Sequence, residues 1–155
     1  LAEVLKDGGE GCPLTKEDYA SLLHKYAACH TLTENGRTVN WIDEDLDEQT
    51  GEWLARKILK TYPDAIPERG IYYNHSTFGD LVISGLFGLT PTEDGFTVHP
   101  LIPDGWESAS VAEVSLHGHR ISVSADRSDG WRITVDDAPV FTAERKQGFT
   151  YCHKF

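Results

Sequence analysis

The sequence predicts an α+β protein in which a group of helices precedes an antiparallel β-sheet region. Before residue 90, apolar side chains recur every three or four positions, and after it they recur every second position. Pairs such as Asp-Gly and Asp-Asp separate the later apolar runs, as they do in hairpins. The change of period predicts two domains, residues 1–89 and residues 90–155.

The first predicted helix starts at Thr15, because a threonine followed three residues later by Asp18 is close to a capping box. Apolar residues then fall at i, i+3, i+4, i+7 and i+8, which predicts one buried face. These residues are Tyr19, Leu22, Leu23, Tyr26 and Ala27. The helix should end near His30, before a turn at residues 34–36, and a short extended piece should follow at residues 38–42.

Two further helices are expected before residue 90. One begins near Thr50 with Trp53 on its buried side, and Pro63 closes it. The other, residues 76–87, is apolar or small nearly all round, which predicts burial on most sides. Gly88 suits the left-handed residue that ends such a helix.

The third helix has more apolar surface than its two neighbouring helices can cover, so the sequence predicts that part of the helical domain is missing. The chain also contains no methionine, which predicts a fragment that does not begin at its own start codon.

Five or six antiparallel strands are expected after Leu89. The apolar residues that mark them are Phe96 and Val98, Val114 and Leu116, Ile121 and Val123, Trp131, Ile133 and Val135, and Val140 and Phe141. Turns are expected at Asp94-Gly95, Gly118, Asp129-Gly130 and Asp136-Asp137.

Composition excludes some partners. The net charge is −11 and the basic residues are scattered, which argues against nucleic acid because phosphate backbones require clustered cations. No apolar run reaches the roughly 18 residues of a membrane span, so no membrane partner is expected.

No cofactor or metal is expected either. The three cysteines have no metal-binding spacing, and the chain has no Gly-rich phosphate loop. His117 and His119 would share a face if extended, but no third ligand has a suitable spacing.

The segment 41–53 is the richest in groups that could carry chemistry. Six acidic residues lie within positions 43–52, and Trp41 and Trp53 flank them. Hydrolysis of a glycosidic bond needs two carboxyl groups, and aromatic rings suit stacking on sugars. The structural alternative is an exposed acidic loop that leads into a helix.

A second segment, residues 69–78, is dense in aromatic and hydrogen-bonding groups just before the third helix. It contains Tyr73, Asn74 and His75. Loops on rigid scaffolds often carry ligand contacts. The structural alternative is that Asn74 or Ser76 caps the helix while the tyrosines pack.

Three stretches together resemble the C-terminal third of the mannosylglycerate-hydrolase-like glycosidases, relatives of processing α-glucosidase I. They are W-I-D-E-D-L-D-E-Q-T-G-E-W (41–53), Y-N-H-S-T-F-G-D-L-V-I-S-G-L-F-G-L (73–89) and H-P-L-I-P-D-G-W (99–106). The resemblance implies that the helices are the last ones of an (α/α)6 barrel, that an antiparallel β-sandwich follows them, and that the enzyme acts on α-glycosides with inversion. It covers most of residues 14–125.

The family's general-base glutamate lies in a motif like E-x-Y-x-P-x-T-G-E. Matching that motif to residues 44–52 places the base at Glu44. This sequence departs from the motif at Leu46, which replaces the aromatic, and at Glu48, which replaces the proline. Asp43 and Asp45 therefore remain alternatives for the base.

The resemblance also implies that the general acid comes from earlier in the barrel, outside this chain, so the isolated chain should be inactive. The expected partners are a carbohydrate substrate and the rest of the catalytic barrel. Trp41 and Tyr73 are expected to stack on sugar, and Asn74 and His75 to contact its hydroxyls or orient the carboxylate.

Two other functions stay open from the sequence. One is a non-catalytic carbohydrate-binding module that uses Trp106 or Trp131, and the other is a structural β-appendage. The compartment cannot be read from the sequence.

Overall fold

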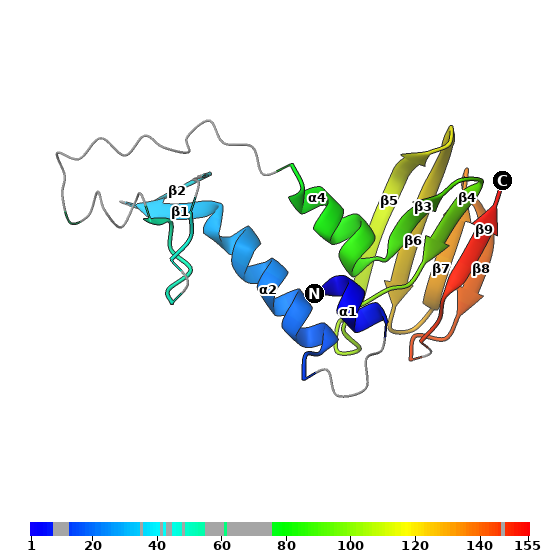
Figure 1. The fold of residues 1–155 in the computed structure, drawn as a ribbon, viewed down its shortest axis with the longest axis horizontal. Coiled ribbons are helices and arrows are strands. Elements are labelled where there is room, and N and C mark those ends of the chain that lie inside the picture. Colours follow the sequence, from blue (N-terminus) through cyan, green and yellow to red (C-terminus); the bar gives the residue numbers. More distant parts are fainter. Residues whose placement is uncertain are drawn as a thin grey trace. The chain divides into compact units, whose positions relative to one another are not determined.

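The structure is a computed structural model that describes residues 1–7, 13–34, 36–40, 42, 45–47, 49–54, 61, 76–146 and 148–155. The chain forms two compact units (Figure 1). The first contains residues 1–20 and 78–155, and the second contains residues 21–77. The division into two domains, residues 1–89 and residues 90–155, stays a prediction from the sequence. Among the described ranges, no helix is both long enough and apolar enough to cross a bilayer.

The helical elements are α1 (Ala2–Lys6), α2 (Lys16–Cys29), α4 (Phe78–Asp80) and the π-helical turn η1 (Leu81–Leu86). The capping box that was expected before α2 is confirmed. The Asp18 carboxylate accepts hydrogen bonds from the backbone N–H and the hydroxyl of Thr15, each at 2.8 Å, and the Thr15 hydroxyl accepts from the Asp18 N–H at 3.2 Å. These bonds lower the pKa of the Asp18 carboxyl.

The buried face of α2 differs from the expected one. Tyr19 and Leu23 are buried as expected, but Leu22 is 54% exposed and Ala20 is buried instead. Helical spacing alone gives the width of an apolar stripe, and the packing partners decide which edge of it is covered.

The third predicted helix is present as α4 and η1, from Phe78 to Leu86, and in this chain it is buried only in part. Its C-terminal end, from Gly85, is buried, whereas Leu81 is 46% exposed. The Phe87 N–H donates to the Val82 carbonyl at 3.0 Å, an i to i−5 bond that widens the last turn. Gly88 follows with φ = 69°, the left-handed residue that the sequence predicted.

The described residues of the first unit form seven strands in two antiparallel sheets, which confirms the predicted α+β class and the sandwich (Figure 1). One sheet has the order β3-β4-β9 and the other has the order β5-β6-β7-β8. Their bounds are β3 (Leu89–Thr92), β4 (Gly95–Val98), β5 (Ser108–Leu116), β6 (His119–Asp126), β7 (Gly130–Val135), β8 (Ala138–Ala143) and β9 (Tyr151–Lys154).

Alternating residues of the sheets form the core. Buried apolar residues include Phe96 and Val98 on β4, Ile121, Val123 and Ala125 on β6, and Trp131 and Ile133 on β7. Along β9 the half-buried residues alternate with exposed ones. Tyr151 lies 4.7 Å from the ring of Phe141 on β8, and His153 stacks at 5.0 Å on Phe96. The ring contacts of β9 therefore reach both its own sheet and the facing one.

The second unit contains a hairpin of β1 (Thr31–Glu34) and β2 (Arg37–Asn40). Glu34 pairs with Arg37 across the two-residue turn that was expected around residue 35. The sequence predicted an extended segment only at residues 38–42, so β1 is an addition. The second predicted helix does not begin near Thr50, because Thr50 lies in a turn and Trp53 pairs with Leu46 in a β-bridge. Residues 55–60 lie outside the described residues, so a helix there stays a prediction.

Candidate functional site

The described part of the acidic segment, residues 45–47 and 49–54, folds back on itself. Leu46 and Trp53 form an antiparallel bridge. Around it the Leu54 N–H donates to the Asp45 carbonyl at 2.9 Å, and the Asp47 N–H donates to the Glu52 carbonyl at 2.8 Å. Three consecutive residues on each side are thus tied together, so this stretch has a defined backbone rather than the form of an open acidic loop.

Asp47 organises the turn inside this bridge. One oxygen of its carboxylate accepts three hydrogen bonds, from the backbone N–H of Gln49 at 3.0 Å, the N–H of Thr50 at 2.8 Å and the hydroxyl of Thr50 at 3.0 Å. Gly51, at φ = 70°, closes the turn by donating its N–H to the Asp47 carbonyl at 2.8 Å. These bonds give Asp47 a structural role, in which an aspartate mimics a backbone turn.

Trp53 anchors the bridge to the end of α2. Its ring is 2% exposed, and its indole N–H donates to the Cys29 carbonyl at 2.6 Å. His30 meets the Trp53 ring edge-on at 5.4 Å. The burial that the sequence predicted for Trp53 is confirmed, and a ring so covered is not a sugar platform.

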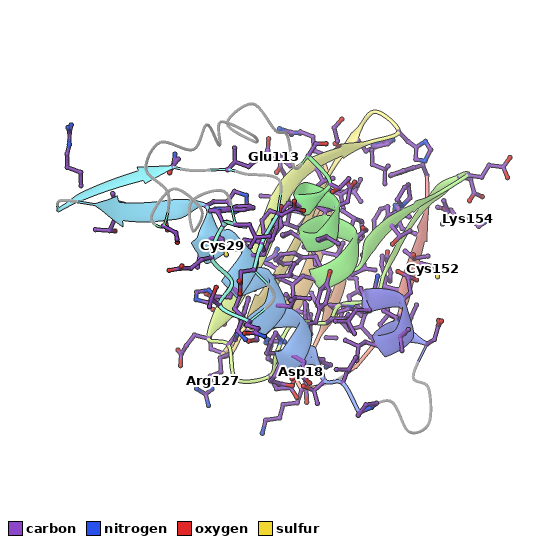
Figure 2. The ribbon with its side chains drawn as sticks, turned by 60° about the vertical axis from the view of Figure 1, so that its left-hand side comes forward. Asp18, Cys29, Glu113, Arg127, Cys152 and Lys154 are labelled. Carbon is purple, nitrogen blue, oxygen red and sulfur yellow. The ribbon has the colours of Figure 1, made fainter. Side chains whose placement is uncertain are left out.

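Cys29 lies beside the same turn, with its sulfur 2.9 Å from the Gly51 carbonyl. Burial raises the pKa of the Cys29 thiol, so the thiol stays protonated and unreactive at neutral pH. Figure 2 shows Cys29 at the end of α2.

The predicted site residues fall outside this description. The candidate base Glu44, its alternative Asp43, and the sugar-contact candidates Trp41, Tyr73, Asn74 and His75 all lie outside the described residues. Asp45, the other alternative, is described and exposed, and its carbonyl is engaged by Leu54. The described residues of this segment, 45–47 and 49–54, therefore form the C-terminal side of the candidate site.

The two histidines of the His117-Gly118-His119 segment have separate structural roles. His117 and Gly118 form the turn between β5 and β6, and the His117 ring lies 2.9 Å from the Thr92 carbonyl. His119 pairs with the Asp136 carboxylate at 2.7 Å and stacks on Phe155 at 4.3 Å. Within the described ranges, no three His, Cys, Asp or Glu side chains gather closely enough to hold a metal ion.

The structure also reveals a feature that the sequence analysis missed. An open depression of ≈ 660 Å³ lies between the β6–β7 turn and the residues that follow β8, and Arg145 lines it. Arg145 is buried, although arginines are mostly exposed in proteins. Its neighbours in the sequence, Glu144 and Lys146, are polar and exposed, so no periodicity marked it.

The sandwich is similar to a known family of domains. Residues 89–145, which span β3 to β8, match the family model described as glycosyl hydrolase family 65, C-terminal domain. One solved structure, named "Sialidase", is similar to this chain, with 33% sequence identity and a TM-score of 0.66. The similarity covers 86% of this chain and 12% of that one. A search of the curated proteins found no match.

Both likenesses support a C-terminal module of a glycoside hydrolase. Neither distinguishes the mannosylglycerate-hydrolase-like subtype from other glycosidases. The chain spans only 12% of the length of the solved protein that it resembles, so most of that protein has no counterpart here.

Proposed function

We propose that this chain is the C-terminal part of a glycoside hydrolase of the mannosylglycerate-hydrolase-like or processing α-glucosidase-like group, which cleaves α-glycosidic bonds with inversion. The observation that carries the glycoside-hydrolase part of the proposal is the 33% identity over 86% of the chain to the solved "Sialidase" structure, together with the family 65 match of the sandwich. The subtype and the inversion rest on the resemblance of residues 41–53, 73–89 and 99–106. The helices before Gly88 would then be the last ones of an (α/α)6 barrel. The substrate is a carbohydrate, and the chain's main partner is the rest of its own barrel.

In the proposed mechanism, Glu44 is the general base that deprotonates the attacking water. The general acid comes from the part of the enzyme outside this chain and protonates the leaving oxygen. In an inverting site the two carboxyl groups lie about 6.5–9.5 Å apart, which leaves room for the water between them. No cofactor takes part.

The ordered turn after Glu44 supports this assignment. A general base must be held in a fixed position, and such positions are stabilised by hydrogen bonds of the neighbouring chain. Asp45 and Asp47 are tied to residues 52–54 by backbone hydrogen bonds, and Asp47 also closes the turn with its side chain. The alternatives to Glu44 remain Asp43 and Asp45.

The remaining roles follow from the same proposal. Trp41 and Tyr73 stack on the sugar, while Asn74 and His75 contact its hydroxyls or orient the carboxylate of Glu44. Since the general acid is absent from this chain, the isolated chain has no hydrolase activity.

The test is the substitution Glu44→Gln in the full-length enzyme. Loss of a general base typically costs about 10²–10⁴-fold, so we expect kcat to fall by that factor while the melting temperature stays close to that of the wild type. Glu48→Gln, which changes an acid of the same segment where the motif has a proline, is the matched control and should retain most activity. Proton NMR of the first product should show the inverted anomer.

Wild-type kinetics for Glu44→Gln would exclude Glu44 as the base, and a product with retained configuration would overturn the inverting mechanism. Activity in the isolated chain would contradict the assignment of the acid to the missing part.

A non-catalytic carbohydrate-binding or structural module is the second candidate, because the sandwich has a core of its own. Of its two proposed platforms, Trp131 is buried and donates its indole N–H to the Arg145 carbonyl at 3.2 Å, so it cannot stack on a sugar. Trp106 is 39% exposed and remains suitable. Sugar affinity of the isolated chain that Trp106→Ala removes would favour this second candidate.

A further inference from the structure

Arg145 is a buried cation that the proposed function does not use. Its side chain starts just after β8, and the residue is 8% exposed. Nη2 donates to the Pro103 carbonyl at 2.8 Å, and the guanidinium lies 4.8 Å from the centre of the Trp131 ring. Nε and Nη1 are also buried, and in the part of the chain that the structure describes neither has a hydrogen-bond partner.

Such a guanidinium is costly to bury. Buried polar groups in proteins are nearly always paired, and a buried charge without a counter-charge loses its hydration with little compensation. The contact with Trp131 offsets part of this loss, since cations are attracted to the faces of indole rings. Two donors still lack acceptors, which points to an acceptor that is bound to this site.

The surroundings of Arg145 fit an anionic acceptor. The depression that it lines has three cationic side chains, from Arg127, Arg145 and Lys146, against two acidic ones, from Asp129 and Glu144. The whole chain, by contrast, carries a net charge of −11. Figure 2 shows Arg127 at one end of the four-stranded sheet, pointing away from it.

The depression is also suitable in size and chemistry. Its ≈ 660 Å³ lies within the range of small-molecule sites. Arg127 is only loosely held, because its ion pair with Glu107, at 3.0 Å, joins two side chains that are 69% and 84% exposed. It can therefore turn toward a ligand without breaking a buried contact.

We propose that this depression binds a small oxyanion, namely the carboxylate or sulfate group of an acidic sugar, and that Arg145 is its principal partner. The guanidinium turns about its terminal side-chain bonds and presents its unpaired N–H groups to the anion, while Lys146 and Arg127 add charge at the rim. Guanidinium groups suit carboxylate and sulfate oxygens because their planar donors match these acceptors. The proposal of an oxyanion rests on Arg145. The further statement that this oxyanion belongs to a sugar rests on the proposed function.

Isothermal titration calorimetry of the full-length protein tests the proposal, with D-glucuronate, inorganic sulfate and neutral D-glucose as probes. We expect glucuronate and sulfate to bind and glucose not to bind. Arg145→Gln should weaken glucuronate binding about tenfold or more, the effect of losing a hydrogen bond to a charged group. The matched control Arg132→Gln removes an exposed arginine from β7, outside the depression, and should leave the affinity unchanged.

Arg145→Gln also removes a buried contact to Pro103, so circular dichroism must show that the variant is folded. If Arg145→Gln is not folded, binding is measured instead with Lys146→Gln and Arg127→Gln, which change the exposed rim. Each should weaken binding by up to about fivefold, as exposed charges do.

Several results would overturn the proposal. They are no heat with either anion, equal binding of glucose and glucuronate, or unchanged affinity in folded Arg145→Gln and in both rim variants. Binding of sulfate but not of glucuronate would overturn the sugar assignment alone. None of these outcomes depends on Glu44, so the proposed glycosidase mechanism stands or falls separately.

Discussion

Two glycines, Gly85 and Gly88, allow segments that are distant in the sequence to approach each other closely. A Cβ at Gly85 would collide with the Tyr19 hydroxyl, which donates to the Leu81 carbonyl at 2.8 Å. A Cβ at Gly88 would collide with the backbone of His99, whose N–H donates to the Gly88 carbonyl at 3.1 Å. The first glycine lets a side chain approach the helix, and the second lets two backbone segments approach each other.

Substitution of Gly88 should therefore be costly. Gly88→Ala places a side chain on a residue with φ = 69°, a backbone conformation that residues with a side chain rarely adopt. The new Cβ would also collide with the His99 backbone, which cannot move easily. We expect the free energy of unfolding to fall by about 1–3 kcal/mol or more, measured by urea denaturation.

Gly79→Ala is the matched control for that substitution, because a Cβ at this helical glycine meets nothing within 4 Å. It should leave the stability unchanged or raise it by up to about 1 kcal/mol. Equal effects of the two substitutions would show that backbone conformation and space at Gly88 do not matter.

Asp136 gives the stability a dependence on acid pH. Hydrogen bonds, first from the Arg120 N–H and then from His119, lower the pKa of its carboxyl. A lowered pKa in the folded protein stabilises it above the pKa of the unfolded chain, about 3.9, and this contribution disappears as the pH falls through the folded value.

The variant Asp136→Asn keeps the left-handed turn conformation but not the charge. We expect it to be less stable than the wild type at pH 6, and the difference to shrink as the pH falls below about 4. Urea denaturation of both proteins between pH 3 and pH 7 measures this. A difference that stays constant over the whole range would contradict the role of the charge.

Whole elements show which sequence signals are sufficient. Turns were predictable because their residues are constrained: Asp136 and Asp137 both take positive φ, as the turn between β7 and β8 requires. Strands β6 and β7 were predictable because one face of each is buried. The capping box of α2 was predictable because its hydrogen bonds join residues three apart.

Other elements carried no such signal. Strand β3 contains Pro91, and β9 reads Tyr-Cys-His-Lys, so neither shows the apolar alternation of a strand. β9 instead contributes aromatic and imidazole rings, which pack as apolar groups only once their partners on β4 and β8 are in place. The bulge in β5, where Glu113 takes φ = 59°, is likewise set by pairing with β6 and not by local sequence.

The start of α2 offers a test at this scale. Thr15→Ala removes the hydroxyl that exchanges hydrogen bonds with Asp18, and we expect the free energy of unfolding to fall by about 0.5–2 kcal/mol. Thr15→Ser keeps the hydroxyl and should stay close to the wild type. Urea denaturation of both variants measures the difference. A loss of equal size in both variants would assign the effect to the methyl group and not to the cap.

At the scale of the whole molecule, the sandwich was predictable and the candidate site was not. Alternating burial fixes a sheet from one sequence, whereas a site joins residues whose chemistry has no periodicity. Glu44 came from a motif resemblance alone, and Arg145 could not be found at all, since its burial depends on Pro103 and Trp131, which are distant in the sequence.

Several rings of the three-stranded sheet gather around Phe96 on β4. Phe96 is fully buried, and its ring contacts Tyr151, His153 and Phe155 at 5.0–6.3 Å. Phe96→Ala should lower the free energy of unfolding by about 3–5 kcal/mol, because it opens a cavity between rigid strands. The exposed Thr90→Ala on the neighbouring strand should change it by less than about 0.5 kcal/mol, measured in the same urea titration.

The pairing of β9 with β4 has a consequence for how this protein is made and how its gene can change. Val98 pairs with Tyr151, so a ribosome must synthesise more than fifty further residues after β4 before that strand acquires its second neighbour. A nonsense or frameshift mutation between the codons for Val98 and Tyr151 would leave the hydrogen-bonding edge of β4 open and the ring of Phe96 uncovered. Open, apolar strand edges pair with other chains. Such alleles should therefore yield aggregated protein in the cell, even though every residue of the preceding acidic segment is still encoded.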